Sequence, residues 1–479
     1  MKKYLYLFLI SIFFPLVLWA QNPQGAIPSL PNKKGTSTSV APGTLKSKPN
    51  APVVLPAEET GGDDPEGEVL IKIKASPKSG LLKGSQTPSY NVDLKSTYKV
   101  KQDGKLTVMV TTDMGEKVTE KFYNVKLGKE GSRSIDVDLP RQQPGFYQVR
   151  FMLNLSFYDD TLKRIYGVEP ERITAQTNKP GDFDTFWDNS KTVLSKIEPQ
   201  YKVTRQADQS TKDKDVYLVE MRSWSNAVIR GWLTIPVKRS KKIPVKYRLP
   251  GYVITMKPTL DDDEFAVFNL NVRGNGNSKD SLKYNGEYNL YHINSRDEYI
   301  YRAVYMDCVR GMDFITAYAD YFGFDEDKVA VVGGSQGGAL ALVLAGLDNR
   351  AKLVTAELPL YSDIRDAIKI GTALYPEKKS PVWMLGDYVR KTPSFNEKRL
   401  FALWDYYDPI NFAPAVKCPV LLAVSLLDEL CPPRASFAMY NQLASKKKET
   451  WVSPNLTHEV DDSYYQFQYY WIKETFVLP

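Results

Sequence analysis

A short glycine-rich turn around Ser335 constrains this chain more than any other feature, because of what lies on either side of it. The run 329–332 is short, apolar and mostly β-branched, and it predicts a buried strand. The run 339–345 consists of good helix formers. Residues 333–338 between them read GGSQGG and contain the G-x-S-x-G motif. A sharp strand-to-helix turn needs neighbours without Cβ atoms and presents its serine as a nucleophile elbow.

The pattern after about residue 166 predicts the fold class. Strand patterns alternate with helical patterns over the last two thirds of the chain, which indicates a doubly wound, mostly parallel sheet of the α/β-hydrolase type. The predicted strands are 216–221, 229–235, 245–249, 265–272, 353–356, 420–426 and 450–452. The predicted helices are 182–196, 298–321, 434–446 and 461–476.

The sequence before this region has a different pattern. Residues 21–65 contain 21 Pro, Gly, Ser or Thr and predict a flexible linker. Residues 66–165 show short alternating runs separated by Gly and Pro, which predict a small accessory β-sandwich. Its aromatic residues are more typical of a core than of a carbohydrate-binding surface. The predicted strands are 69–74, 98–101, 106–110, 134–139 and 147–151.

The N-terminus predicts export. Lys2 and Lys3 precede an apolar run at 4–19, and Ala20 follows it as a small residue at a cleavage point. The alternative, an uncleaved anchor helix, is disfavoured by the length of the run and by Pro15. We therefore expect a signal peptide over residues 1–20, and a periplasmic or secreted protein with no stable membrane anchor after cleavage.

Charge and cysteine content exclude other classes. The formal net charge of +7 is spread over 479 residues, and no Lys/Arg block indicates a nucleic-acid partner. Lys446–Lys448 is expected at a solvated helix end. The three cysteines, Cys308, Cys418 and Cys431, are too few for a disulfide scaffold, and no Cys/His cluster has metal-ligand spacing. We expect neither a cofactor nor a metal.

The base is predicted from chain order. A serine hydroxyl needs a base within hydrogen-bond reach, and that base needs a third group to orient it. The chain has two histidines. In α/β-hydrolases the serine comes first, the acid second and the histidine last. His458 follows the last predicted strand, whereas His292 precedes Ser335, so the sequence favours His458.

The acid should follow a strand between the serine and the histidine. Asp428 directly follows the apolar run 420–427, and Pro432-Pro433 close the loop behind it. Two rivals remain, Glu429 beside it and Glu357 at the end of the preceding strand. The sequence favours Asp428 over both.

Acyl transfer also needs donors for the oxyanion of the tetrahedral intermediate. In this fold one donor is the backbone N–H of the residue after the nucleophile, here Gln336. The other comes from a loop after an earlier strand, here residues 250–252.

Together these motifs resemble a known family. The turn at 333–338, Asp428 with the following Cys431-Pro432-Pro433, and His458-Glu459 are similar to the acetyl xylan esterase/cephalosporin C deacetylase family, carbohydrate esterase family seven. The resemblance covers about residues 165–479. Three further stretches agree with it, at 182–187, 272–274 and 407–413.

The resemblance implies deacetylation of xylan, xylo-oligosaccharides or small acetylated sugars, without a cofactor. It implies that Ser335, Asp428 and His458 form the catalytic triad. It also implies that Tyr252 and Gln336 supply the oxyanion N–H groups.

One motif departs from the family pattern. The family usually has Arg-Gly-Gln where this chain has Arg273-Gly274-Asn275, so Asn275 keeps the amide on a shorter side chain. Family members often form closed hexamers with active sites facing an inner chamber, so the resemblance implies a homo-oligomer. The β-domain at 66–165 lies outside the minimal family pattern and can block or alter that assembly.

The sequence therefore predicts a secreted serine esterase acting on acetylated carbohydrates through an acyl-enzyme, in a domain at 166–479. One alternative is a serine peptidase or another α/β-hydrolase, although residues 66–165 are too few for the propeller that prolyl-oligopeptidase-type enzymes usually carry. The other is a non-catalytic glycan-binding protein on a hydrolase scaffold.

Overall fold

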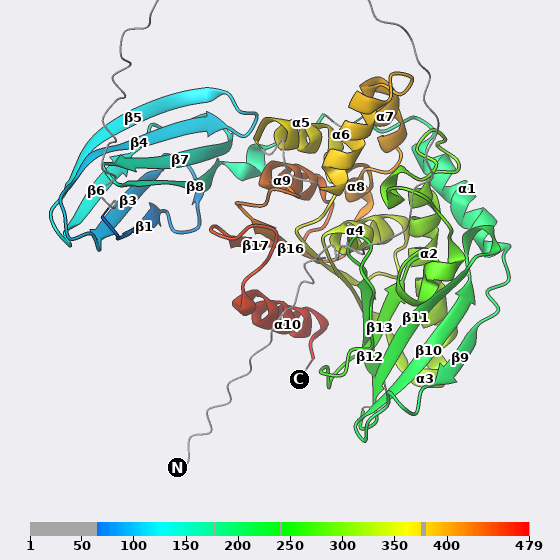
Figure 1. Ribbon diagram of the computed structural model, residues 1–479. Helices are drawn as coiled ribbons and strands as arrows, with labels where there is room; N and C mark the ends of the chain where they lie inside the picture. Colours follow the sequence, from blue (N-terminus) through cyan, green and yellow to red (C-terminus); the bar gives the residue numbers. More distant parts are fainter. Residues whose placement is uncertain (1–64, 177, 240–241, 375–379, 479) are drawn as a thin grey trace, which may run out of the picture. The chain divides into compact units, whose positions relative to one another are not determined.

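The computed structural model describes residues 65–176, 178–239, 242–374 and 380–478 (Figure 1). The predicted signal peptide at 1–20, and the predicted linker up to residue 64, lie outside the described residues. Within the described ranges, no helix is both long enough and apolar enough to cross a membrane.

Two sheets form the N-terminal part and share one core. Side chains such as Val92 of β3 and Val108 of β4 are fully buried between them, and the rings of Tyr90 and Phe151 meet edge to face with centroids 5.2 Å apart. The first sheet consists of β1 (Val69–Ser76), β3 (Ser89–Ser96) and β6 (Ser132–Asp138). The second consists of β2 (Leu81–Leu82), β8 (Tyr158–Val168), β7 (Gly145–Leu155), β4 (Gln102–Thr112) and β5 (Lys117–Leu127).

One predicted strand of this part is wrong. Residues 98–101 form the connection between β3 and β4, where Tyr98 is buried and donates its hydroxyl hydrogen to the carbonyl of Phe157. The strand lies instead at Ser89–Ser96, where buried Tyr90, Val92 and Leu94 alternate with polar residues. β8 also continues to Val168, three residues beyond the predicted end of this part.

A third sheet, of nine strands, lies in the rest of the described chain and confirms the predicted α/β-hydrolase fold class. Its order is β17-β16-β15-β14-β12-β13-β11-β10-β9, with parallel pairing from β17 to β13 and antiparallel pairing beyond. The strands are β9 (Lys202–Arg205), β10 (Lys214–Arg222), β11 (Val228–Pro236), β12 (Ile243–Leu249), β13 (Ala266–Asn271), β14 (Phe324–Gly334), β15 (Leu353–Glu357), β16 (Val420–Ser425) and β17 (Lys448–Ser453).

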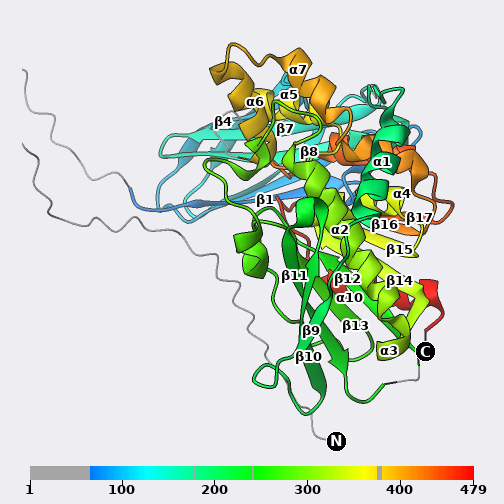
Figure 2. The same ribbon diagram turned by 90° about the vertical axis from the view of Figure 1, so that its right-hand side faces the viewer.

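The helices divide between the two faces of this sheet (Figures 1 and 2). Side chains from α1 to α9 pack with Tyr247 of β12 and Val331 of β14 in one core. α10 packs with Val332 of β14 and Ala423 of β16 in another. The helices are α1 (Phe183–Ser195), α2 (Ile300–Ala317), α3 (Ala319–Phe322), α4 (Gln336–Leu347), α5 (Ile364–Leu374), α6 (Pro381–Lys391), α7 (Glu397–Trp404), α8 (Pro409–Phe412), α9 (Pro433–Gln442) and α10 (Asp462–Phe476).

Two predicted helices differ from the observed ones. The pattern at 298–321 contains two helices, because the backbone of Tyr318 leaves the helical region between α2 and α3. The helix predicted at 434–446 ends earlier, because Leu443 is extended. Lys446–Lys448 is therefore not a helix end; its last residue opens β17.

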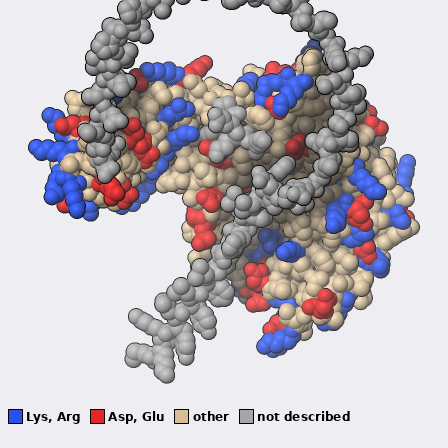
Figure 3. Space-filling view, viewed as in Figure 1, with Lys and Arg blue, Asp and Glu red and all other residues tan. Residues whose placement is uncertain are grey.

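Charge is mixed over the face drawn in Figure 3. Where described residues form this face, lysine and arginine side chains lie among aspartate and glutamate side chains. Charges of both signs are therefore interspersed on this face.

The β-sandwich packs directly on the helical layer through α9. The ring of Phe146 from β7 lies 5.6 Å from that of Phe437 in α9. Beside them Arg434 binds Asp113, which follows β4, through contacts of 2.5 Å from Nε to Oδ2 and 3.1 Å from Nη2 to Oδ1. Burial raises the pKa of the Asp113 carboxyl, and the Arg434 guanidinium acts against that rise.

We expect Arg434→Met to lower the free energy of unfolding by about 3 kcal/mol, because it leaves the buried Asp113 carboxylate without its partner. Urea unfolding at neutral pH measures this change. The matched control is Arg172→Met, which removes a more exposed pair with Glu169 and should change stability by less than about 1 kcal/mol. Equal effects of the two substitutions would show that the Arg434 pair does not stabilise the fold.

Candidate active site

Ser335 lies between β14 and α4 in a strained backbone conformation. Its φ is 56° and its ψ is −121°, outside the regions that residues with a Cβ atom normally adopt. Its N–H donates to the carbonyl of Glu357 at 2.8 Å, and its carbonyl accepts from the N–H of Leu360 at 3.1 Å. The end of β15 and the loop after it therefore hold the backbone of the turn on both sides.

The glycines of the motif are required by close backbone contacts. A Cβ atom at Gly333 would lie 2.3 Å from the carbonyl of Gly337. A Cβ atom at Gly337 would lie 2.3 Å from the carbonyl oxygen of Leu249 in β12. Real Cβ atoms do not approach backbone so closely, so only glycine lets α4 begin this near to β14 and β12.

The predicted base and acid lie together. His458 follows β17, Asp428 follows β16, and His458 Nδ1 lies 2.8 Å from Asp428 Oδ2. The other carboxylate oxygen, Oδ1, accepts hydrogen bonds of 2.8 Å from the N–H groups of Leu430 and Cys431. Burial raises the pKa of the Asp428 carboxyl, and these hydrogen bonds act against the rise. Because the carboxylate accepts, the imidazole carries its proton on Nδ1 and presents Nε2 as an acceptor.

Cys431 connects this pair to the serine. Burial raises the pKa of its thiol, and the side chain of Ser335 acts against that rise. Its Sγ also lies within 4.8 Å of a ring nitrogen of His458 and of a carboxylate oxygen of Asp428. The predicted nucleophile, acid and base therefore gather around one thiol at the carboxyl ends of the parallel strands. Sequence spacing did not indicate this role for Cys431.

The two residues predicted to supply the oxyanion donors, Gln336 and Tyr252, are connected through hydrogen bonds to the loop at 250–252. Gln336 is the first residue of α4, so its N–H has no carbonyl within the helix to bind. Its side-chain Nε2 lies 3.4 Å from the carbonyl oxygens of Pro250 and Gly251. The start of α4 is thus linked to the loop that carries Tyr252.

A buried tyrosine network, which the sequence did not indicate, supports Gln336. The hydroxyl of Tyr301 in α2 donates to Gln336 Oε1 at 2.7 Å and lies 3.1 Å from the hydroxyl of Tyr361. Asn289 donates to the Tyr361 hydroxyl at 3.2 Å, and its own N–H donates to the hydroxyl of Tyr252 at 3.2 Å. These residues are far apart in the chain, so no spacing rule could have grouped them.

Two residues that the sequence weighed as rivals have other partners. His292 lies at the surface, 3.3 Å from Glu298, and its ring lies tilted against that of Tyr291. Glu357 accepts a hydrogen bond of 2.8 Å from Gln468 of α10, on the other face of the sheet.

The Arg273-Gly274-Asn275 motif stabilises the loop after β13. Arg273 forms a buried two-point ion pair with Asp307 of α2, with contacts of 2.8 Å from Nε to Oδ2 and 2.6 Å from Nη2 to Oδ1. Asn275 is buried, and its Nδ2 lies 3.4 Å from the carbonyl of Arg273. The shortened amide is thus satisfied within its own turn.

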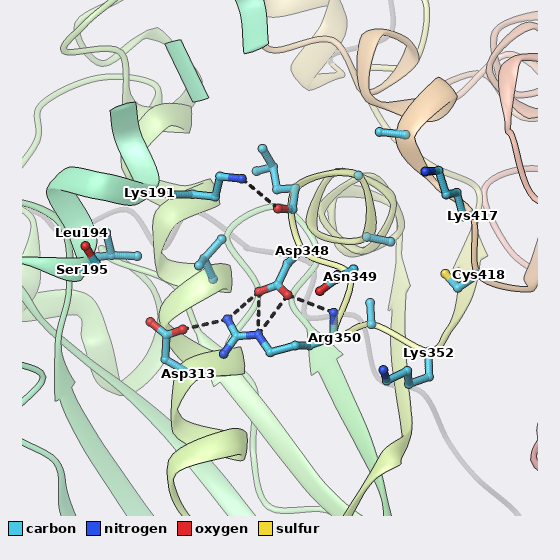
Figure 4. Close-up of a pocket in the computed structure, with 16 residues that line it drawn as sticks. Lys191, Leu194, Ser195, Asp313, Asp348, Asn349, Arg350, Lys352, Lys417 and Cys418 are labelled. Carbon is cyan, nitrogen blue, oxygen red and sulfur yellow. Dashed lines mark hydrogen bonds and ion pairs between the residues drawn. The ribbon is translucent and has the colours of Figure 1, made fainter. Parts of the chain in front are cut away.

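A cavity of about 800 Å³ lies elsewhere, at the opposite end of α4 from Ser335 (Figure 4). α4 has 12 residues, so its two ends are roughly 18 Å apart. Inside the cavity Arg350 binds Asp348 and Asp313, and Lys191 donates to the carbonyl of Leu347. Arg350 and the two aspartates thus bind one another, and the residues that line the cavity do not include Ser335, Asp428 or His458.

Comparisons with known proteins find related sequences. A family model described as acetyl xylan esterase (AXE1) matches residues 167–475, a range that includes Ser335, Asp428 and His458. The acetyl esterase Axe7A of Xylanibacter ruminicola is 29% identical over 361 residues, which cover 72% of this chain and 78% of that protein.

Solved structures give the same result. An acetyl xylan esterase from Paenibacillus sp. R4 matches with a TM-score of 0.58 and 27% identity, over 64% of this chain and 98% of its own. Acetyl xylan esterase 1 from Thermoanaerobacterium sp. JW/SL YS485 matches with a TM-score of 0.58 and 25% identity, over the same shares.

We expect Glu357 to make stability depend on pH. Burial raises the pKa of its carboxyl from 4.5 to about 7. Below pH 4.5 the carboxyl is protonated in the folded and unfolded states alike. As the pH rises toward 7 the unfolded chain ionises first, so the free energy of unfolding should fall by on the order of 1 to 3 kcal/mol.

Glu357→Gln should remove this component, so the difference in stability between the variant and the wild type should grow from pH 4.5 to pH 7. Urea unfolding of both proteins across that range measures it. A difference that stays constant with pH would contradict the raised pKa.

Proposed function

The chain belongs to the acetyl xylan esterase family and is a carboxylic ester hydrolase, and we propose that it is an exported serine esterase for O-acetylated carbohydrates. In this proposal Ser335 forms an acetyl-enzyme. The proposed substrates are acetylated xylan, xylo-oligosaccharides and small acetylated sugars. Export rests on the predicted signal peptide, and self-association rests on the resemblance to hexameric relatives.

The observation that carries the proposal is the 2.8 Å contact between His458 Nδ1 and Asp428 Oδ2, beside a serine in a strained turn. The carboxylate fixes the imidazole in the tautomer that leaves Nε2 free to accept a proton. The strained turn keeps the hydroxyl of Ser335 at the sheet edge. The Ser335 side chain acts on the pKa of Cys431, whose Sγ lies within 4.8 Å of ligand atoms of His458 and Asp428. A surface histidine without a catalytic role would not need a hydrogen bond to a buried carboxylate.

In the first half-reaction the Ser335 oxygen attacks the acetyl carbonyl carbon while His458 Nε2 accepts the hydroxyl proton. The charge that develops on the carbonyl oxygen is stabilised by the backbone N–H groups of Gln336 and Tyr252. Each such donor lowers the barrier by about 3 kcal/mol. His458 then gives its proton to the sugar oxygen, which leaves as the alcohol.

In the second half-reaction water takes the place of the sugar. His458 Nε2 accepts a proton from the water, which attacks the acetyl carbonyl carbon. His458 then returns that proton to the Ser335 oxygen as its bond to the acetyl carbon breaks, which releases acetic acid and regenerates the Ser335 hydroxyl. Acetyl is small, so the acyl side of the site needs little room, and the bulk of the substrate lies on the alcohol side.

We expect Ser335→Ala and His458→Ala each to lose about 10⁶-fold in kcat, because a triad acts as a unit. Acetate release from p-nitrophenyl acetate and from acetylated xylan measures this loss. Normal turnover by either variant would rule out the proposed mechanism. A wild-type protein that binds acetylated xylan without releasing acetate would favour the glycan-binding alternative.

The assignment of the acid is tested by a matched pair of substitutions. Asp428→Asn should cost about 10⁴-fold in kcat, because the amide favours the wrong imidazole tautomer. Glu357→Gln should leave kcat near the wild-type value. The reverse result would make Glu357 the acid.

The tyrosine network should affect the rate through the oxyanion donors. Tyr301→Phe leaves the buried Gln336 Oε1 without a donor, an imbalance of about 1 to 3 kcal/mol, so we expect kcat to fall roughly tenfold with little change in KM.

The control is Tyr305→Phe on the same helix, whose buried hydroxyl donates to the carbonyl of Tyr407 instead. It should cost similar stability and leave kcat unchanged. Equal losses of kcat in both variants would show that the network acts on stability alone.

A further inference from the structure

Three metal-ligating side chains meet beside the proposed nucleophile. One ligand atom each from Asp428, Cys431 and His458 lies within 4.8 Å of the other two. Among the described residues, this is the one group of three or more His, Cys, Asp or Glu side chains that is close enough to hold a metal ion. The thiol of Cys431 transfers no proton and forms no covalent bond in the proposed hydrolysis, so its position beside the base and the acid calls for a separate explanation.

The ligand types select one class of cation. Thiolate, imidazole and carboxylate together are typical of zinc sites, whereas magnesium and calcium prefer oxygen ligands alone. Tetrahedral zinc lies about 2.0–2.3 Å from such ligands, so two ligands of one ion are about 3.3–3.8 Å apart. The three atoms lie within 4.8 Å of one another, so they would have to approach by about 1 Å to surround one ion.

Charge and access fit the same cation. The carboxylate of Asp428 and the thiolate of Cys431 would together balance a double positive charge, so the occupied site would be neutral, as a buried site requires. Asp428 and Cys431 are almost fully buried, whereas a quarter of the His458 side chain is exposed. A small cation would reach the site past the imidazole.

We propose that Cys431, His458 and Asp428 form an inhibitory site for a soft divalent cation of the zinc class. The site rests on the proposed function only in its effect on the rate, because binding itself needs no catalysis.

Binding of the cation displaces the thiol proton of Cys431 and leaves the imidazole of His458 neutral. Cys431 loses its thiol proton to solvent when its sulfur binds the cation. If the cation binds His458 Nδ1, the ring proton moves to Nε2, which then no longer accepts a proton from Ser335. If the cation binds Nε2, the base is occupied directly. In both arrangements the imidazole stays neutral and cannot act as a base.

Within the described part of the chain, neither of the other two cysteines belongs to such a group of ligands. Cys308 is buried in α2, where its carbonyl accepts from the Tyr247 hydroxyl. Cys418 lines the cavity at the far end of α4, beside Lys417 and Lys352 (Figure 4). Cationic neighbours repel a divalent cation, so Cys418 is the matched control for Cys431.

Binding is tested first, with Co²⁺ as a spectroscopic substitute for Zn²⁺. Full-length wild type and Ser335→Ala should both show a thiolate-to-cobalt charge-transfer band, which excess Zn²⁺ removes. Cys418→Ser should keep the band. Cys431→Ser should lose it and should weaken Zn²⁺ binding by at least about 10–100-fold, the loss that even a changed outer-shell partner causes.

A second variant protects the test against misfolding. His458→Ala changes a partly exposed side chain and should also lose Zn²⁺ affinity, as measured by calorimetry. A cobalt–thiolate band that persists in Cys431→Ser, or Zn²⁺ affinity that is unchanged in both variants, would overturn the site.

Inhibition is then measured on acetate release. Zn²⁺ should lower kcat of the wild type and of Cys418→Ser, EDTA should restore it, and Mg²⁺ or Ca²⁺ should have no effect. Cys431→Ser should resist Zn²⁺. Zn²⁺ binding with undiminished kcat would refute the inhibitory role. A wild type that binds Zn²⁺ but releases no acetate without it would instead refute the proposed function.

Discussion

The strained backbone of Ser335 is the constraint on which the rest of the site depends. Its φ of 56° is maintained by the residues around it. The carbonyl of Glu357 binds its N–H, the N–H of Leu360 binds its carbonyl, and the first turn of α4 packs against β12. The parallel strands bring the end of β15 to the same edge of the sheet as the turn. Without that pairing the serine would relax, and the residues around it would have no common centre.

Buried polar groups then keep this edge in one arrangement. The carboxylate of Asp428 is satisfied by His458 and by two backbone N–H groups of its own loop. The amide of Gln336 is satisfied by Tyr301 and by the loop before Tyr252. Each group is expensive to leave unpaired at such depth, so the network favours a single geometry over a loose one.

The β-sandwich packs close to the loop that carries Asp428. It packs against α9, the helix that begins directly after Cys431 and Pro432, and Asp113 holds the first turn of that helix through Arg434. The family match begins only at residue 167, so this contact joins an additional part to a common catalytic fold. α9 directly follows the loop that carries Asp428. The contact with α9 therefore connects the sandwich physically to the site.

Chain order and local pattern determined the fold class, the turn at Ser335, and the choice of Asp428 and His458 as partners. These features depend on short runs and on the sequential order of motifs, which the sequence displays directly. Tertiary structure alone decided that Cys431 lies beside Asp428 and His458, and that Tyr301 donates a hydrogen bond to Gln336. It also decided that residues 98–101 are not a strand. Such contacts join side chains that are far apart in the chain, and only the packing of strands and helices determines which of them meet.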